Sequence, residues 1–207
     1  MRGYLSAAVA MLAVTVSAQD RGTTGSLERP FSANGLVKMD LSAGDYHITG
    51  SPEKRVRLDW SVRDTEALAK VRATADVHNV GHQGSSRAEL SIATDGPSSK
   101  GLRFKIQVPS QSDLYVRLSA GDLTIEDIRG NKDVELRAGD LRIDVGRPDH
   151  YKKVDASLWA GDIKASAFQI FKGGLFRSFD WSGDGAYRLH AHLMAGDLYL
   201  YSKEATR

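Results

Sequence analysis

Five aspartates, each in a copy of the pattern Leu-x-Ala-Gly-Asp, are the first candidates for chemistry in this sequence. They are Asp45, Asp122, Asp140, Asp162 and Asp197. If successive copies stack as neighbouring strands, Asp122, Asp140 and Asp162 lie roughly 5 Å apart. Carboxylates that close together favour a bound cation or a raised pKa.

Calcium is the sharpest chemical hypothesis for Asp122, Asp140 and Asp162, because it takes carboxylate and backbone oxygens as ligands. The nine-residue calcium-binding repeats, however, are denser in Gly and Asp than this chain. A pair such as Asp140 and Asp162 is an alternative acid and base for glycan cleavage. Five near-identical copies favour a third interpretation, in which each Asp bonds backbone donors at its own corner. We therefore expect no catalytic residue, metal or cofactor.

The histidines offer a weaker metal hypothesis. His190 and His192 are two residues apart on one predicted strand, and His78 and His82 lie in a predicted loop. Either pair could give two zinc ligands, but the chain has no Cys, and no third His completes a site. Solvent exposure is the simpler interpretation. Nucleophile elbows, phosphate loops and dinucleotide fingerprints are also absent from the sequence.

The outward-facing positions of the repeat give the better functional lead. Three residues before the last two repeat aspartates stand Trp159 and Met194, and Tyr199 and Tyr201 follow the final one. An exposed face should be polar, so these side chains need either a partner or a cover. The cover would be the aromatic-rich segment 168–179. The alternative is an interaction patch that stacks a glycan or binds a protein, with Trp159, Tyr199 and Arg137 as its candidate residues.

The elements that position these residues are short strands joined at corners. Leu and Ala alternate before each Asp, and apolar residues alternate again after it in the opposite phase, so each copy is two strands with one buried face. Gly accepts a positive φ and Asp bonds nearby backbone donors, which suits a corner where the phase changes. The predicted structural corners are Gly44, Asp45, Gly121, Asp122, Gly139, Asp140, Gly161, Asp162, Gly196 and Asp197.

The spacing of the copies predicts how these strands assemble. Asp140 follows Asp122 by 18 residues, and Asp162 follows Asp140 by 22. That distance suits one turn of a β-solenoid, in which stacked rungs build the core together. A β-sandwich of repeated hairpins is the alternative. Elsewhere, residues 65–77 predict a short helix running into a strand, residues 78–87 a loop, and residues 187–193 one continuous strand.

The N-terminus has the features of a secretory signal peptide. Arg2 precedes a mostly apolar run, and small residues lead to Ala18. We expect residues 1–18 to be removed, 19–34 to form a flexible leader, 35–201 a single β-repeat domain and 202–207 a tail. The apolar run is too short for a comfortable membrane span. Export to the periplasm, the cell surface or the medium follows.

The charge balance limits the classes of partner, and the absence of cysteine limits the sources of stability. The sequence has 28 basic and 26 acidic residues. Removal of the signal peptide takes away Arg2, so the exported chain would have 27 basic and 26 acidic residues. This balance gives no electrostatic case for nucleic acid or for an anionic membrane surface. Without Cys the chain has no disulfide, so its stability must come from burial and strand pairing.

As a set, several of these features resemble the bacterial putative-adhesin family, a domain of unknown function built from β-strand repeats. The resemblance covers roughly residues 35–201. It is carried by the exported N-terminus, the serial Gly-Asp corners and the segments 104–109, 114–122 and 183–197. The family implies a right-handed β-solenoid in an exported setting, and it supplies no catalytic residues.

The sequence therefore predicts an exported, non-catalytic, adhesin-like module. It would present a repetitive β surface to an envelope protein or glycan that the sequence does not identify. A polysaccharide-acting enzyme on the same fold is the alternative. Pairing of two copies through an exposed end of the stack, as a homodimer, stays open.

Overall fold

The computed structural model describes residues 23–63, 65–82, 85–96 and 101–203, and these are almost entirely β-structure. The predicted signal peptide lies outside the described residues. One α-helix, α1 (Thr65–Lys70), leads into the strand that follows it, as the sequence predicts. None of the described helices has the length and apolar character needed to cross a membrane.

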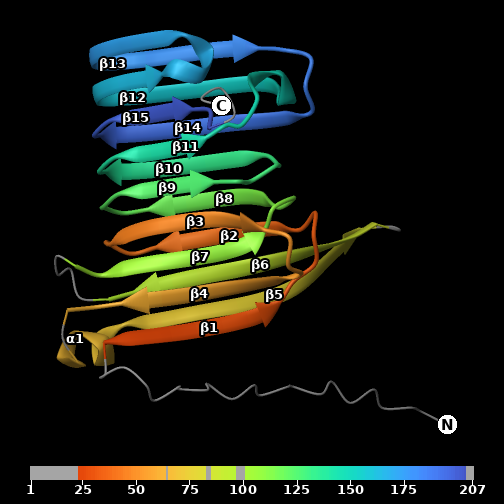
Figure 1. Ribbon diagram of the computed structural model, residues 1–207, viewed down its shortest axis with the longest axis vertical. Coiled ribbons are helices and arrows are strands. Elements are labelled where there is room, and N and C mark those ends of the chain that lie inside the picture. Colours follow the sequence, from red (N-terminus) through yellow and green to blue (C-terminus); the bar gives the residue numbers. More distant parts are fainter. Residues whose placement is uncertain (1–22, 64, 83–84, 97–100, 204–207) are drawn as a thin grey trace.

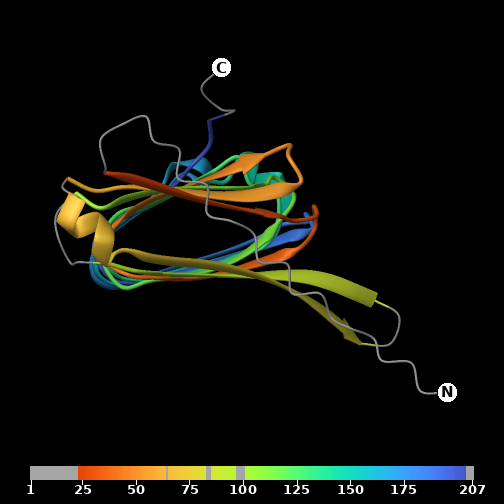
Figure 2. The ribbon, with the colours of Figure 1, turned by 90° about the horizontal axis from the view of Figure 1, so that it is seen from below.

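The strands form one 15-stranded sheet that folds into two facing layers (Figure 2). In the first layer the order is β5 (Arg72–His82), β6 (Ser85–Asp95), β2 (Leu36–Leu41), β8 (Asp113–Leu118), β10 (Lys132–Ala138) and β14 (Tyr187–Ala195). In the second it is β1 (Thr24–Pro30), β4 (Arg55–Ser61), β7 (Arg103–Pro109), β3 (Asp45–Ser51), β9 (Leu123–Glu126), β11 (Leu141–Asp144) and β15 (Leu198–Tyr201).

Strand β12 (Tyr151–Ala165) joins the two layers at one end of the stack (Figure 1). Its first part pairs with β14 and its last part with β15, both in parallel. The outermost strand is β13 (Ile170–Ser182), which runs antiparallel along β12. Two short 3-10 turns, η1 (Pro148–His150) and η2 (Ser166–Phe168), flank β12.

Parallel pairing in fixed register builds the core. In the first layer β2, β8, β10, β14 and β12 pair in parallel, so equivalent positions of the repeat stack directly. Met39, Val116, Val134, Ala191 and Ala156 form one such buried row. Because successive strand residues point to opposite faces, the same register also aligns the outward side chains.

The opposite end of the stack closes differently. Strands β4 and β7, β1 and β4, and β5 and β6 pair antiparallel. Arg29 on β1 donates from Nε to the carbonyl of Ala75 on β5 at 3.1 Å, which links the two layers there. The sheet is therefore nearly closed at this end, with α1 beside it (Figure 2).

The spatial order of the repeat copies departs from their order in the chain. The corner of Asp197 lies between those of Asp140 and Asp162, because β14 and β15 pair with β10 and β11 on one side and with β12 on the other. After β12 the chain turns back through β13. Strand β14 then lies between β12 and β10, and strand β15 lies between β12 and β11. The expectation that Asp140 and Asp162 are direct neighbours was wrong for this reason.

The prediction of an all-β fold is confirmed, and residues 187–193 lie within the single strand β14 as predicted. Two local predictions were wrong. Residues 24–30, placed in a flexible leader, form β1 and pair with β4 along their length. Residues 78–87, predicted as a loop, belong largely to the β5–β6 hairpin, whose pairing extends to His82 and Ser85.

Candidate functional site

The five Gly-Asp corners stack into a column along one edge of the molecule. The backbone N–H of Asp140 donates to Oδ1 of Asp122 at 3.1 Å. Asp197 donates in the same way to Asp140 at 3.0 Å, and Asp162 to Asp197 at 3.0 Å. The carboxylates of Asp122, Asp140 and Asp197 therefore each bind the backbone N–H of the next copy in the stack.

The glycines of this column are held at closest backbone approach. Gly121, Gly139, Gly196 and Gly161 all have φ between 116° and 137°, a region that side chains rarely adopt. A Cβ on Gly196 would lie 1.9 Å from the carbonyl oxygen of Gly139. Glycine is thus required at these corners by both backbone conformation and space.

Basic side chains neutralise the aspartates. Arg142 pairs with Asp140 at 2.8 Å and lies 3.7 Å from Asp122, while Lys164 pairs with Asp197 at 2.7 Å and lies 3.6 Å from Asp162. The hydrogen bond from Lys164 lowers the pKa of Asp197, the opposite of the shift expected for crowded carboxylates. Over the described ranges, no group of three or more His, Asp or Glu side chains is arranged to hold a metal.

The histidines take separate partners. On β14, Nδ1 of His192 is 2.8 Å from Oγ of Ser157, and Nδ1 of His190 is 4.0 Å from Asp155. His47 pairs with Glu126 at 2.9 Å in the second layer. His78 is exposed on β5, and the side chain of His82 lies outside the described residues.

Trp159 and Arg137 fall in one outward row of the first layer. The register of β10, β14, β12 and β13 places Arg137 beside Met194, Met194 beside Trp159, and Trp159 beside Phe176. We call Arg137, Met194, Trp159 and Phe176 the Trp159 row. Trp159 is 50% exposed and Phe176 73%, and their ring centroids are 5.9 Å apart.

The predicted cover does not close over this row. The segment 168–179 runs mainly along the edge of β12, and Phe168 packs instead on Phe179 and Trp181, at 5.5 and 5.2 Å between ring centroids. A shallow groove of about 570 Å³ lies beside the row, lined by Ser157, Leu158, Trp159, Phe176, Arg177, Ser178, His192 and Met194.

Tyr199 lies in the other layer, on β15, and does not join the Trp159 row. Its ring contacts Arg142 and Lys164, each at 4.9 Å from the ring centroid, and its hydroxyl donates to Asp197 at 3.0 Å. The structure therefore brings two of the three predicted binding residues together and places Tyr199 among the basic partners of the aspartate column.

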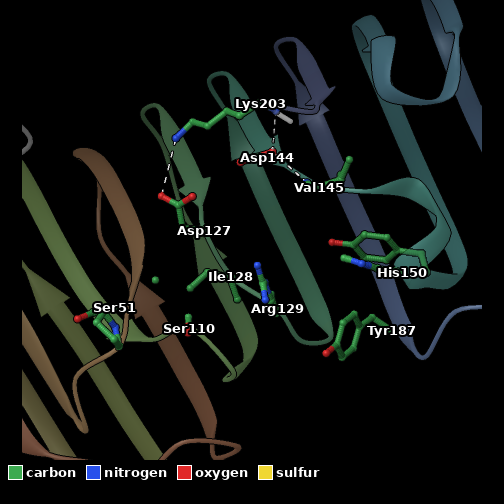
Figure 3. A pocket seen from close by; sticks show the side chains of 14 residues that line it. Ser51, Ser110, Asp127, Ile128, Arg129, Asp144, Val145, His150, Tyr187 and Lys203 are labelled. Atoms are coloured by element: carbon green, nitrogen blue, oxygen red, sulfur yellow. Dashed lines mark hydrogen bonds and ion pairs between the residues drawn. The ribbon is translucent and has the colours of Figure 1, made fainter. Parts of the chain in front are cut away.

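The edge opposite the aspartate column holds a cavity of about 530 Å³ (Figure 3). Asp127, Arg129, Asp144, His150 and Tyr187 are among its lining residues. Lys203 reaches across it, and its ammonium lies 3.8 Å from Asp127 (Figure 3). The backbone N–H groups of Gly146 and Lys203 both donate to Oδ1 of buried Asp144. The cavity therefore lies where the end of the chain is fastened to the stack.

A buried lysine that the sequence analysis did not single out lies close to this cavity. Lys132 occupies an inward position that Leu114, Leu189 and Val154 occupy on neighbouring strands. Its Nζ donates to the carbonyl of Ile128 at 2.8 Å and to the hydroxyl of Tyr151 at 2.9 Å. Burial lowers the pKa of Lys132 to about 8. Alignment of the repeat copies would have revealed it, because a lysine interrupts a column of apolar residues.

A second unpredicted cluster surrounds Glu126. Tyr201 donates to its Oε1 at 2.7 Å, and Lys203 and His47 lie 3.0 and 2.9 Å from its Oε2. Burial alone would raise the pKa of Glu126, but these hydrogen bonds outweigh it and lower the pKa to about 2. The partners are far apart in the chain, so no local sequence pattern signals the cluster.

Comparison with known proteins supports the fold. No protein-family model matches the chain, and no curated protein matches its sequence. The chain is similar to a solved putative cell adhesion protein from Clostridium sporogenes, with 13% identity and a TM-score of 0.57. The match covers 87% of this chain and 100% of that one.

Weaker matches are to solved putative adhesins. For one from Bacteroides fragilis the identity is 8% and the TM-score 0.30, over 86% of this chain and 97% of that one. For one from Parabacteroides distasonis they are 15% and 0.25, over 61% and 54%. The resemblance to putative adhesins predicted from the sequence is confirmed, and at these identities it concerns the fold alone.

Proposed function

We propose that this chain is an exported, non-catalytic, adhesin-like module that presents the Trp159 row to a protein or glycan of the cell envelope. The observation that carries the proposal is the half-exposed Trp159, held between Met194 and Phe176 on the outward face of the sheet. An indole in that position offers a large apolar face with little conformational entropy to lose on binding. We expect the module to work in the periplasm or at the cell surface.

The stack below the row supplies rigidity. Strands β10, β14 and β12 of the row are fixed by parallel pairing and by the aspartate column at their ends, while β13 pairs antiparallel with β12. We infer that the repeat copies act as the rungs of a right-handed β-solenoid, with the Gly-Asp corners as its repeated turn. A surface held in this way needs no ordering on binding, which favours affinity.

The aspartates do not favour the enzymatic alternative. Asp140 accepts the N–H of Asp197 and pairs with Arg142, and Asp162 lies beyond Asp197 in the stack. Their roles are accounted for by the column itself. If Asp140→Asn abolished a glycan-cleaving activity without changing stability, the non-catalytic proposal would be wrong.

The proposal is tested by affinity capture from envelope extract on the exported chain. We expect one retained protein or glycan, with retention lost in Trp159→Ala and reduced in Arg137→Ala. Tyr115→Ala is the matched control, because Tyr115 is an outward aromatic of the same layer outside the Trp159 row. Retention that is equal in Trp159→Ala and the parent chain would contradict the proposal.

The same capture tests the calcium hypothesis. Comparing retention with and without a calcium chelator shows whether binding of the partner depends on the metal. Because Arg142 and Lys164 already neutralise the aspartates, we expect retention to be independent of calcium. Retention only in the presence of calcium would restore Asp122, Asp140 and Asp162 as a metal site.

A further inference from the structure

The end of the stack formed by β13 carries large apolar side chains that point into solvent. Phe171 is 68% exposed and Leu175 is 61% exposed, in addition to Phe176. They surround the bend where Gly174 of β13 pairs with Gly161 of β12. At this end β13 is the outermost strand (Figure 1). We call Phe171, Leu175, Phe176, Lys172 and Arg177 the β13 tip.

The backbone of this edge strand is partly protected against strand addition. Nζ of Lys172 donates to the carbonyl of Ser178 at 2.7 Å, and Nε of Arg177 donates to the carbonyl of Gly173 at 2.6 Å. Charged side chains on an edge strand discourage pairing with another chain. Another strand would have to displace these bonds, so β-sheet extension by a second copy is disfavoured at the tip.

The tip carries two cations, and Asp162 of β12, which stands opposite Gly173, pairs with Lys164 and not with either of them. Within the described part of the chain, neither Lys172 nor Arg177 has a carboxylate partner, and no acidic residue lines the groove beside Phe176. The atoms that they bond are neutral carbonyl oxygens, so these hydrogen bonds bring no negative charge to the tip. The near-neutral charge of the whole chain therefore conceals a small basic region with bulky apolar side chains at its centre.

We propose that the β13 tip is a docking site for a membrane surface with anionic headgroups. Phe171, Leu175 and Phe176 would enter the boundary between headgroups and acyl chains, while Lys172 and Arg177 lie among the phosphates. Exposed apolar side chains with flanking cations are the combination that interfacial binding uses. A polysaccharide would leave the aliphatic Leu175 without a suitable partner, so a bilayer is the better match to these residues.

This site adjoins the Trp159 row, and Arg177 also lines the groove beside the row. The two surfaces share Phe176, but Phe171 and Leu175 lie outside the row. A chain docked at the tip would hold the outward face of the first layer at an angle to the bilayer. Arg137, Met194 and Trp159 could then meet an envelope partner while the tip, including Phe176, is bound.

Sedimentation with lipid vesicles tests the proposal on the exported chain. We expect it to bind vesicles of phosphatidylglycerol mixed with phosphatidylcholine, and to bind pure phosphatidylcholine more weakly. The double variant Phe171→Ser/Leu175→Ser should lower the partition coefficient at least about tenfold, because two large apolar side chains are removed from the boundary. Lys172→Gln/Arg177→Gln should lower it by about fivefold to thirtyfold, and added salt should reproduce part of that loss.

Val77→Ser is the matched control, since Val77 is an exposed apolar residue on β5, far from the tip in the strand order. It should bind vesicles like the parent chain. Binding that is unchanged in Phe171→Ser/Leu175→Ser, or absent altogether, would overturn the proposal. Two other results would assign the tip a different partner and contradict membrane docking. One is a concentration-dependent dimer that Phe171→Ser/Leu175→Ser abolishes, and the other is binding of polygalacturonate without binding of vesicles. Neither outcome depends on capture by the Trp159 row.

Discussion

The two edges of the stack are built in opposite ways. Along the Gly-Asp edge the same contact recurs from Asp122 through Asp140 and Asp197 to Asp162, and in each case an aspartate accepts the N–H of the next one. Along the opposite edge each contact occurs once, as in the bonds of Lys132 and the cluster around Glu126. The first edge sets how copies stack, and the second fastens particular segments, including the end of the chain.

The largest expected effect comes from adding a methyl group at the repetitive edge. Gly196→Ala forces a Cβ to within 1.9 Å of the carbonyl oxygen of Gly139 at φ 128°. We expect a loss of on the order of 3 kcal/mol or more in the free energy of unfolding, because neighbouring backbone must move apart. Urea unfolding measures it.

Gly146→Ala at the opposite edge is the control for that substitution. Gly146 has φ 61°, but a Cβ there meets nothing within 4 Å. Only the conformational cost of about 1 kcal/mol remains. Equal losses at Gly196 and Gly146 would show that close backbone approach does not distinguish the two edges.

The second effect concerns the buried Lys132 and depends on pH. Its pKa of about 8 in the folded chain lies below the usual value near 10.5, so the folded state binds this proton less tightly than the unfolded state. Its contribution to stability is therefore lowest below pH 8 and rises as the pH increases toward 10.5. Between pH 7 and 9.5, the free energy of unfolding of the parent chain should rise by about 2 kcal/mol relative to that of Lys132→Met. Parallel pH profiles of the two proteins would contradict this assignment.

The third effect runs in the opposite direction with pH. Glu126 has a pKa of about 2 in the folded chain, so its stabilisation is complete above pH 4.5 and is lost as the pH falls toward 2. Allowing for solvent screening, we expect Glu126→Gln to cost about 1–2 kcal/mol at pH 7 and little at pH 2. Thermal unfolding across that range checks it, and a pH-independent loss would point to packing instead of charge.

The smallest effect is expected for a single carboxylate of the column. Asp140→Asn keeps an oxygen that can accept the N–H of Asp197 but loses the ion pair with Arg142. Because this pair is partly exposed, the loss should be about 0.5–1 kcal/mol. Asp140→Ala, which also removes the acceptor, should cost more. If the two variants are equally stable, the acceptor does not contribute.

The contrast between the edges also explains which features could be predicted. The Gly-Asp corners and the buried alternation recur in the sequence, so their structural role follows from pattern alone. The position of β14 and β15 next to β12 does not follow from the pattern, because it depends on how β13 turns back along β12. Glu126 and its partners His47 and Tyr201 are separated by more than 70 residues.

The candidate site was predictable in part for the same reason. Arg137 and Trp159 hold equivalent positions in the repeat, so they align once their strands stack, whereas Tyr199 follows the corner and therefore falls in the other layer. The exposure of Phe176 could not be predicted, because it depends on β13 being the last strand of the sheet.

In this account the repeat builds the scaffold, and the Trp159 row binds the envelope protein or glycan. The most direct test measures thermal stability and envelope retention together in Gly196→Ala and Trp159→Ala. We predict that Gly196→Ala lowers the melting temperature markedly, whereas Trp159→Ala keeps the parent melting temperature and loses retention. A Trp159→Ala protein that unfolds early, or one that stays folded and retains its ligand, would contradict the division of roles.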